Sequence, residues 1–320
     1  MVSGLNAVGV DVGGTKIAAG VVSPEGEILA DVRRPTPQSP EKLVEAIVGA
    51  VKEVMDGREV GAACLAVPGH ILAQENKVVF SANLHAIEGI PLKDKIEPEI
   101  GVPLTIENDA SAAAWGEFRF GAGSEADHLV FVTLGTGVGG GVISHGVLLR
   151  GAQGSGGELG HVTVHATGPR CGCGNRGCLE ALASGTAIGR RGREAAVERP
   201  ASALGRIAAR RKVLGEDVTE LARSGDETAI SVLEETGTWL GIGLAGFVNV
   251  FNPEVVAVGG GAMAAGDLIL APARREIRLR ARPPSRDLVE VQAATLGPES
   301  GVLGAAALAR GADGEYVLGD

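Results

Sequence analysis

The chain has 320 residues and a formal net charge of −10, because 39 acidic residues outnumber 29 lysines and arginines. This charge repels nucleic acid and anionic membranes, so a general polyanion-binding function is disfavoured. Glycine occurs 50 times without a Gly-X-Y period, and 45% of the residues are hydrophobic. The composition therefore excludes collagen and disorder, and the length predicts a folded protein of two domains.

The start of the chain does not have the pattern of a secretory signal. No lysine or arginine precedes Lys16, and Asp11 interrupts the first apolar stretch, so we expect a cytoplasmic protein. Residues 128–149 lack Asp, Glu, Lys and Arg over a length that could cross a membrane. The glycines between Gly135 and Gly141 would break such a helix, and the segment is predicted to form two strands and a turn.

Strands and helices alternate along the chain, which predicts an α/β fold. Residues 8–12, 17–22 and 27–32 have the pattern of an antiparallel three-stranded meander. A helix is predicted to begin at Pro40, with Ser39 as its N-cap. Further strands are predicted at residues 61–67, 103–106, 129–134, 138–143 and 255–258, and further helices at residues 109–118, 227–248 and 301–309 and after Gly261.

Two segments with the order strand, glycine turn, strand resemble each other at an offset of 122 positions. Residues 8–22 placed over residues 130–144 give three identities, among them Gly13 with Gly135. Chance could produce this in a chain rich in valine and glycine. If the repeat is real, the protein has two related halves, each with one glycine turn facing a shared cleft.

Three glycine-rich turns follow predicted strands. The first, DVGGTK at residues 11–16, places an acid before two residues without Cβ, a hydroxyl and an ammonium group. Backbone N–H groups in such a turn can converge on a phosphate. Residues 134–141 and 258–261 are further candidates, and a tight hairpin or close packing would explain each one alone. Together they favour a nucleotide site, although none is a Walker A loop.

Asp109 lies where a predicted strand meets a predicted helix. An aspartate at such a junction can be the N-cap of the helix. Beside a phosphate site, it can instead take the proton from an attacking hydroxyl group. The residues alone leave both interpretations open.

His161, Cys171, Cys173 and Cys178 have the spacing H-x9-C-x-C-x4-C within a glycine-rich loop. Three thiolates and one imidazole satisfy tetrahedral zinc, and four protein ligands leave no open position, so the zinc is expected to be structural. A disulfide is disfavoured in a cytoplasmic protein. Cys64 lies within a predicted strand and is expected to be a core residue.

Two carboxylates, Glu158 and Glu180, flank the zinc loop. Exposed carboxylates are usually only solvated. Brought together with a metal-fixed imidazole, however, they could bind a polyol, because carboxylates accept hydrogen bonds from hydroxyl groups.

These motifs together resemble the ROK family (repressors, open reading frames and kinases), which belongs to the actin-like, hexokinase-type phosphotransferases. The resemblance runs from residue 8 to about residue 309, and its bacterial glucokinases are the most similar group. It is carried by residues 11–16, 107–110, 134–141, 157–161 and 171–180.

The resemblance implies transfer of the γ-phosphoryl group of ATP to the 6-hydroxyl of glucose, with Mg²⁺ accompanying ATP. It implies a two-lobed actin-like (ribonuclease H-like) α/β fold with a cleft between the lobes. The small lobe would hold residues 1–108 and about 301–320, and the large lobe residues 109–300 with the zinc loop at 161–178. A homo-oligomer, dimer or tetramer, is a further expectation at the level of the family.

Asp109 corresponds to the general base of the family. The implied sugar contacts are Gly69, Asn83, Asn108, Asp109, Glu158, His161 and Glu180, with His161 serving both zinc and sugar. The implied nucleotide contacts are Asp11, Gly13, Gly14, Thr15, Lys16, Gly135, Thr136, Gly137, Gly259, Gly260 and Gly261. Many sugar kinases of the family have proline where this chain has Ala82, which weakens the assignment of Asn83. Much of the glycine excess is thus expected to surround the active site.

Several alternatives remain open at this stage. The hexose could be fructose, mannose or an N-acetylhexosamine instead of glucose. Polyphosphate could replace ATP, since residues 190–212 hold eight basic side chains, although a solvated helical face broken at Pro200 is the favoured interpretation of that segment. A non-catalytic sugar sensor would need neither Asp109 nor Lys16. A DNA-binding repressor is not expected, because only ten residues precede Asp11.

Overall fold

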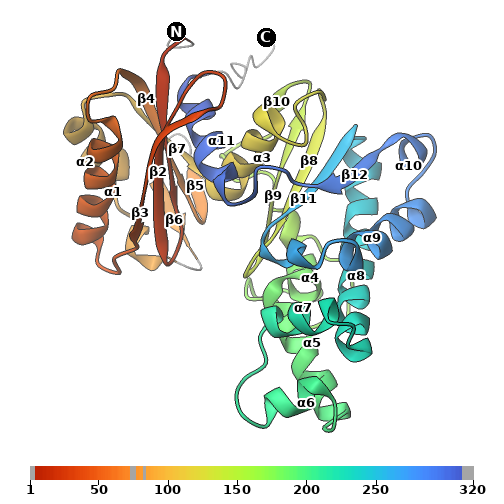
Figure 1. Cartoon of the computed structure of the whole chain (residues 1–320). Helices are drawn as coiled ribbons and strands as arrows, with labels where there is room; N and C mark the ends of the chain where they lie inside the picture. The colour runs from red at the N-terminus through yellow and green to blue at the C-terminus, as the bar shows by residue number, and fades with distance from the viewer. Residues whose placement is uncertain (1–3, 73–76, 82–83, 312–320) are drawn as a thin grey trace. The chain divides into compact units, whose positions relative to one another are not determined.

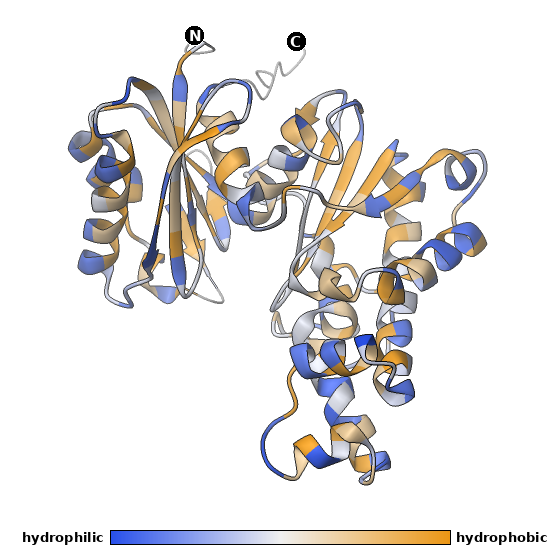
Figure 2. Cartoon of the chain, viewed as in Figure 1, coloured by the Kyte–Doolittle hydropathy of each residue, from blue (hydrophilic) through white to orange (hydrophobic). Residues whose placement is uncertain are grey.

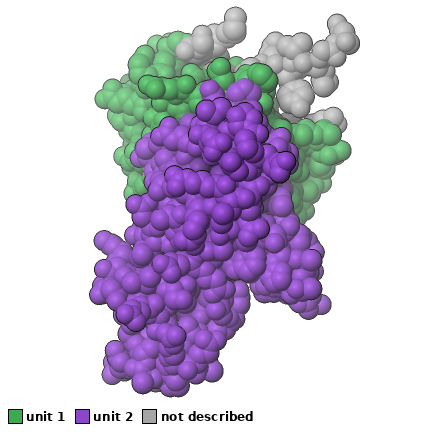
Figure 3. Space-filling model, turned by 90° about the vertical axis from the view of Figure 1, so that its right-hand side faces the viewer, with its two compact units in different colours: residues 1–127, 141–157, 296–320 green, residues 128–140, 158–295 purple. Residues whose placement is uncertain are grey.

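The computed structural model describes residues 4–72, 77–81 and 84–311. Contacts between residues divide the chain into two compact units, which Figure 3 colours separately. Unit 1 comprises residues 1–127, 141–157 and 296–320, and unit 2 comprises residues 128–140 and 158–295.

A mixed five-stranded sheet forms the centre of unit 1. The order of its strands is β3-β2-β1-β4-β7, and the predicted meander is confirmed, since β1 pairs antiparallel with β2 and β2 with β3. The strands β4 and β7 extend the sheet in parallel to β1. The strands are β1 (Asn6–Val12), β2 (Lys16–Val22), β3 (Ile28–Pro35), β4 (Val60–Val67) and β7 (Leu104–Asn108).

Two pairs of helices cover this sheet, one pair on each face (Figure 1). Helix α1 (Pro40–Met55) begins at Pro40 as predicted and buries Leu43, Ile47 and Val51 at helical spacing, with α2 (Leu92–Ile100) beside it. Helices α3 (Asp109–Phe120) and α11 (Ser300–Ala309) pack against each other. A small hairpin of β5 (His70–Leu72) and β6 (Lys77–Phe80) also belongs to unit 1.

The packing of α11 requires glycine at several contact points. A Cβ added to Gly304 would lie 1.7 Å from the carbonyl oxygen of Ala112 in α3, and one added to Gly9 would lie 1.9 Å from that of Val302. Real side chains never approach a backbone oxygen so closely, so these glycines permit the crossings of the helix. Part of the glycine excess therefore serves packing.

The second five-stranded sheet has the order β10-β9-β8-β11-β12. The strand β11 pairs in parallel with β8 and with β12. Both β8 and β11 consist mainly of apolar residues (Figure 2). The strands are β8 (Leu129–Leu134), β9 (Val138–Ser144), β10 (Val147–Leu148), β11 (Val255–Gly259) and β12 (Glu290–Ala293).

The two sheets share one topology. In each, three consecutive strands form a meander, and two later strands extend the sheet on the side of the first one. The residues aligned by the sequence offset, Val8 and Val130, lie in the corresponding strands β1 and β8. The agreement between topology and sequence supports an internal repeat.

Unit 2 holds most of the helices. The longest, α8 (Glu227–Phe251), packs against α9 (Asp267–Arg280), and the predicted helix after Gly261 is preceded by a 3₁₀ turn, Gly261–Ala265. The others are α4 (Leu179–Ala183), α5 (Gly185–Glu198), α6 (Ala203–Ala208), α7 (Gly215–Arg223) and α10 (Ser285–Leu288). Among the helices of the described residues, none is long and apolar enough to cross a membrane.

The division into units differs from the lobe boundary expected after Asn108. Helix α3 belongs to unit 1, because it packs against α11, which returns to the first sheet. Residues 141–157 and 296–300, which were also expected in the large lobe, likewise belong to unit 1.

Candidate active site and metal centre

The turn at residues 13–15 of unit 1 joins β1 to β2. The amide of Gly13 donates to the carbonyl oxygen of Lys16 at 2.8 Å, and the Thr36 hydroxyl donates to the carbonyl oxygen of Gly13 at 2.7 Å. The side chains of Thr15 and Lys16 are exposed. The turn is thus a closed hairpin, as the simpler interpretation required, and it also leaves a hydroxyl and an ammonium group open to a ligand.

Asp11 precedes this turn and faces the start of α11. A Cβ at Gly301 would lie 3.0 Å from the Asp11 carboxylate, so glycine at 301 leaves room for that carboxylate. Burial raises the pKa of Asp11 above its ordinary value, and the nearby Lys16 opposes the shift. An acid kept in this environment carries a cost in stability, which is typical of a functional group.

Asn108, and not Asp109, is the N-cap of α3. Its side-chain oxygen accepts from the amides of Ala110 and Ser111 at 2.9 and 3.0 Å, and its side-chain nitrogen donates to the carbonyl oxygen of Gly69 at 3.2 Å. Asp109 is the first residue of the helix, and its Oδ1 accepts from the amide of Ala110 at 2.8 Å. The capping role that was considered for Asp109 therefore belongs to its neighbour.

The sequence assigned no role to Glu107 or Arg150. Arg150 Nε donates to Glu107 Oε2 at 2.7 Å, and the amide of Asn108 donates to Glu107 Oε1 at 2.9 Å. Glu107 is only 8% exposed. Its position at the end of a buried strand, directly before the Asn-Asp pair, was the one signal available in the sequence.

The four expected metal ligands lie together in unit 2. Their ligand atoms all lie within 4.8 Å of one another. Cys171 Sγ is 3.7 Å from His161 Nδ1, and Cys173 Sγ is 3.7 Å from Cys178 Sγ. Zinc–ligand bonds of about 2.0–2.3 Å in a tetrahedron place neighbouring ligand atoms ~3.6–3.8 Å apart. The residues therefore fit a zinc ion, and Nδ1 is the nitrogen of His161 that faces the other ligands.

The three thiols of this cluster differ in environment. Burial raises the pKa values of Cys171 and Cys178, whereas the Asn175 amide, which points at Cys173, lowers the pKa of that exposed residue. A bound cation would offset the cost of ionising the two buried thiols. All four cysteines of the chain are free of disulfides, and Cys64 is fully buried in β4 as expected.

The loop that carries the ligands is tied to α8. The ring of His165 stacks on Trp239 of that helix, with centroids 5.2 Å apart and planes inclined by 9°. A Cβ at Gly177 would lie 1.6 Å from the carbonyl oxygen of His165. Glycine at this position therefore lets the loop turn tightly. Glu158 is exposed and directly precedes the 3₁₀ turn Leu159–His161.

A pocket of about 690 Å³ lies in unit 2 beside the turn between β8 and β9. Gly135, Thr136 and Gly261, all expected at the nucleotide, contribute to its lining. Gly137 does not line it, and Gly259 and Gly260 lie behind it, where a Cβ at Gly260 would lie 2.5 Å from the Leu134 amide. The described residues thus bring two of the three glycine turns together, and the turn at 13–15 belongs to the other unit.

Most of the pocket wall comes from α5 and α7, which the sequence analysis did not assign to the site. Leu214 is 46% exposed there although it is a large apolar residue. An exposed apolar side chain in a pocket suits a flat apolar group of a ligand, and the glycine turn beside it suits phosphate groups. The further lining residues of the pocket are Gly185, Thr186, Ile188, Gly189, Arg193, Lys212, Gly215, Glu216, Thr219, Glu220, Arg223, Ala262 and Ala264.

Three of the eight basic residues at positions 190–212 form ion pairs, and three others donate to a carbonyl or hydroxyl oxygen. Arg191 contacts Glu194 and Glu235, and Arg211 contacts Asp217. Helix α5 ends at Glu198, before Pro200. These contacts favour a solvated and ion-paired helical surface over a continuous polyanion track.

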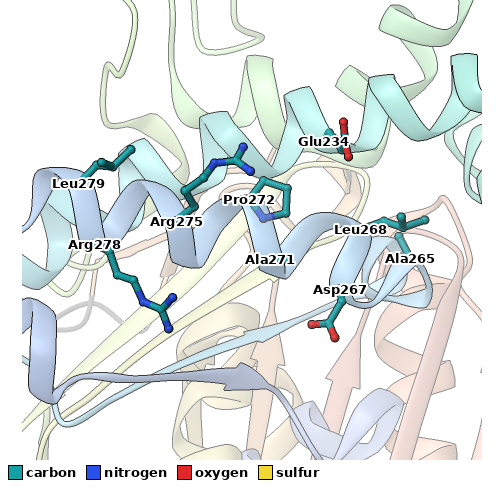
Figure 4. Close-up of a pocket in the computed structure, with 9 residues that line it drawn as sticks. All are labelled: Glu234, Ala265, Asp267, Leu268, Ala271, Pro272, Arg275, Arg278 and Leu279. Atoms are coloured by element: carbon teal, nitrogen blue, oxygen red, sulfur yellow. The ribbon is translucent and has the colours of Figure 1, made fainter.

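A second pocket, of about 700 Å³, lies between α8 and α9. Figure 4 shows Arg275 and Arg278 pointing to different sides of α9, with Asp267 on the same side as Arg278. The basic groups do not converge on one point, so this pocket has no evident anion site.

Asn83, one of the expected sugar contacts, lies outside the described residues. The others are divided between the units: Gly69, Asn108 and Asp109 belong to unit 1, and Glu158, His161 and Glu180 belong to unit 2.

The model of the ROK family matches residues 7–312 of this sequence. The chain belongs to the ROK family. It is 40% identical to the glucokinase of Streptomyces coelicolor over 96% of its own length and 98% of that protein's, and 40% identical to the glucokinase of Thermotoga maritima over 95% and 97%. The crystal structure of a ROK glucokinase from Streptomyces griseus in complex with glucose and AMPPNP superposes with a TM-score of 0.84, 41% identity and coverage of 96% and 99%.

Proposed function

We infer that the protein is an ATP-dependent glucokinase. The observation that carries this function is the full-length similarity to a ROK glucokinase whose structure holds glucose and an ATP analogue. The family assigns the phosphotransfer chemistry, and the described residues supply an acid at the start of α3, glycine turns and a pocket beside one of them.

Asp109 is proposed to act as the general base. In the reaction, the oxygen of the sugar 6-hydroxyl forms a bond to the γ-phosphorus of ATP, and the bond from that phosphorus to the bridging oxygen of ADP breaks. The proton of the hydroxyl passes to the Asp109 carboxylate. The cap formed by Asn108 fixes the backbone next to this carboxylate, because two amides of the first turn are bonded to its side chain.

The pocket beside the turn at residues 135–138 is proposed to hold the nucleotide. Gly135, Thr136 and Gly261 would approach the phosphates, and Leu214 would pack against the base. Asp11, Gly13, Gly14, Thr15 and Lys16 are also proposed to contact the phosphates and the Mg²⁺ that accompanies ATP. Magnesium neutralises charge on the phosphates when it is bound.

The proposed sugar contacts are Gly69, Asn83, Asn108, Asp109, Glu158, His161 and Glu180. The proposed zinc site consists of His161, Cys171, Cys173 and Cys178, and zinc bound there would hold the loop at 161–178 in shape. Carboxylates such as Glu158 and Glu180 can each accept hydrogen bonds from sugar hydroxyls.

We also propose a homo-oligomer in the cytoplasm. Large apolar side chains are exposed on two helices of unit 2, Val250 (73%) on α8 and Leu279 (69%) on α9, and a contact between subunits would remove them from water. Free thiols in the expected zinc cluster are consistent with a reducing compartment. Light scattering on a sizing column measures the oligomeric state directly.

A coupled assay tests the reaction. Glucose, fructose, mannose and N-acetylglucosamine are each offered with MgATP and, separately, with inorganic polyphosphate. Phosphorylation of glucose with ATP at the highest kcat/KM is expected. A higher kcat/KM for another hexose would replace glucose as the substrate, a preference for polyphosphate would replace ATP, and binding of sugar without turnover would indicate a sensor.

A further inference from the structure

Glu180 connects two features of unit 2, the turn at residues 135–138 and the metal cluster. Its Oε2 accepts from the amide of Val138, in the turn that lines the nucleotide pocket, at 3.2 Å. Its Oε1 lies 3.3 Å from Cys171 Sγ, within the metal cluster. A Cβ at Gly137 would lie 2.3 Å from Glu180 Oε2. The carboxylate therefore occupies the space that a side chain at 137 would need.

The segment that leads into the metal loop also contacts this turn and the strand after it. A Cβ at Gly160, directly before the ligand His161, would lie 2.0 Å from the carbonyl oxygen of Val138. The side chain of Leu159 packs on Gly140, where an added Cβ would lie 2.7 Å from Leu159 Cδ1. The backbone at residues 159–160 thus lies directly against β9.

The segment that leaves the metal loop holds the other end of the turn. The Gly185 amide donates to the carbonyl oxygen of Gly135 at 2.8 Å, and the Thr186 hydroxyl donates to that of Thr136 at 2.7 Å. Every residue from 135 to 138 is therefore in contact with a segment that flanks the metal loop.

The loop between these segments has little regular structure of its own. Residues 162–177 contain no helix or strand. Two isolated bridges, Thr163 with Cys178 and Arg170 with Arg176, and single backbone hydrogen bonds within its turns are the loop's own backbone contacts. Metal–ligand bonds contribute much of the folding free energy in loops of this kind. Because Gly160 adjoins one ligand and Glu180 lies two residues after another, fixing the ligands fixes both contacts to the turn.

We propose that the metal centre preorganises the turn at residues 135–138 for the phosphates of the nucleotide, with Glu180 as the positioning residue. This inference rests on the proposed function, which places the nucleotide at that turn. Coupling between two sites is reciprocal, so bound nucleotide also retains the metal. The role in nucleotide binding is additional to the sugar contact proposed for Glu180.

Nucleotide affinity in the absence of sugar tests the coupling. The dissociation constant of Mg·AMPPNP is measured by calorimetry on zinc-loaded protein, on protein freed of zinc by a chelator and dialysed, and on protein reloaded with zinc. We expect affinity to fall ~10-fold without zinc and to recover on reloading. Transfer of zinc to a colorimetric chelator is expected to slow when AMPPNP is present. Circular dichroism verifies that the zinc-free protein is folded.

Two substitutions test the role of Glu180 while the zinc stays bound. Glu180→Ala removes the acceptor for the Val138 amide, and we expect ~10-fold weaker AMPPNP binding at unchanged zinc content. Glu180→Gln keeps a carbonyl oxygen for that amide and is expected to stay within ~3-fold of the wild type. Val162→Ala, in the same loop and exposed, is the control and should leave the affinity unchanged.

The outcomes separate the two levels of inference. AMPPNP binding that is equally tight in folded zinc-free protein, or in zinc-loaded Glu180→Ala, overturns the coupling. Failure of the zinc-loaded wild type to bind AMPPNP at all overturns the proposed function instead. If the zinc-free protein unfolds, the AMPPNP affinities of zinc-loaded Glu180→Ala and Glu180→Gln still decide whether Glu180 positions the turn.

Discussion

Arg150 Nε donates to Glu107 Oε2 at 2.7 Å, and this bond joins the segment after β10 to the end of β7. The second oxygen of Glu107 accepts from the amide of Asn108. The ion pair therefore fixes the backbone immediately before Asp109, although neither of its residues is part of the helix cap.

We predict that Arg150→Ala destabilises the protein by about 3 kcal/mol, because it leaves the buried Glu107 carboxylate without its cationic partner. Glu107→Gln should cost less, since it removes the charge while an amide oxygen can still accept from Asn108. Urea unfolding of both variants gives the comparison. Equal stability of Arg150→Ala and the wild type would show that the pair is dispensable.

Asp109→Asn should lower turnover by ~10²-fold or more, since the amide cannot accept the proton of the sugar hydroxyl. Glucose binding, measured by calorimetry, should persist, and α3 should keep its cap because the capping side chain is that of Asn108. Turnover within a few-fold of the wild type would remove Asp109 from the role of base.

Asp11→Asn should increase stability at neutral pH while reducing activity. Burial raises the pKa of Asp11 in the folded protein, so the folded state binds this proton more tightly than the unfolded state. Stability is consequently lost as the pH rises from the unfolded pKa of ~3.9 through the raised folded value, and the loss persists above it.

The unfolding midpoints of Asp11→Asn and the wild type, measured from pH 3 to pH 8, check this sign. The variant should be the more stable protein at pH 7, and its advantage should shrink as the pH falls toward 4. A variant that is less stable at pH 7 would contradict the prediction. Weaker binding of Mg·AMPPNP is expected in parallel.

Gly304→Ala should destabilise unit 1 by about 1–3 kcal/mol or more, because the new methyl group would overlap the carbonyl oxygen of Ala112. Gly246→Ala is the matched control, since Gly246 also lies in a helix and has open space around its Cα. That control should be neutral or more stable by up to about 1 kcal/mol. Thermal unfolding distinguishes the two.

Metal analysis of freshly purified protein should find one zinc per chain. Cys173→Ala should lower both the zinc content and the stability, because metal binding and folding of the loop are linked. Protein that contains no zinc and is insensitive to chelators would contradict the assignment of the cluster.

Local patterns were sufficient for every strand of the first sheet and for β8, β9 and β11 of the second, whereas β10 and β12 were not predicted. The meander at the start of the chain and α1 follow from strand alternation and helix spacing, and both were correctly predicted. Ligand spacing placed His161, Cys171, Cys173 and Cys178 together, and they do lie together, whereas the zinc ion itself stays a prediction. These features depend on residues close together in the sequence.

The cap of α3 was considered only for Asp109, whereas the structure assigns it to Asn108. Adjacent Asn and Asp residues have nearly equal capping preferences, so only the backbone geometry distinguishes them.

Local sequence patterns could not predict contacts between segments that are far apart in the sequence. Arg150 meets Glu107 across 43 positions, and Glu180 meets Val138 across 42. The wall that α5 and α7 give to the proposed nucleotide pocket also depends on how these helices pack against the turn after β8. No local propensity records such pairings.

The glycines show most clearly what the sequence determined and what depended on the tertiary structure. By itself, the sequence determined the fold class, the family, the four candidate metal ligands and the excess of glycine near expected ligand sites. Only the tertiary structure decided which glycines permit packing, such as Gly9 and Gly304, and which leave room for a carboxylate, such as Gly137 beside Glu180. The reason is physical: a missing Cβ has an effect only through the atom that comes to occupy its space, and that atom belongs to a distant part of the chain.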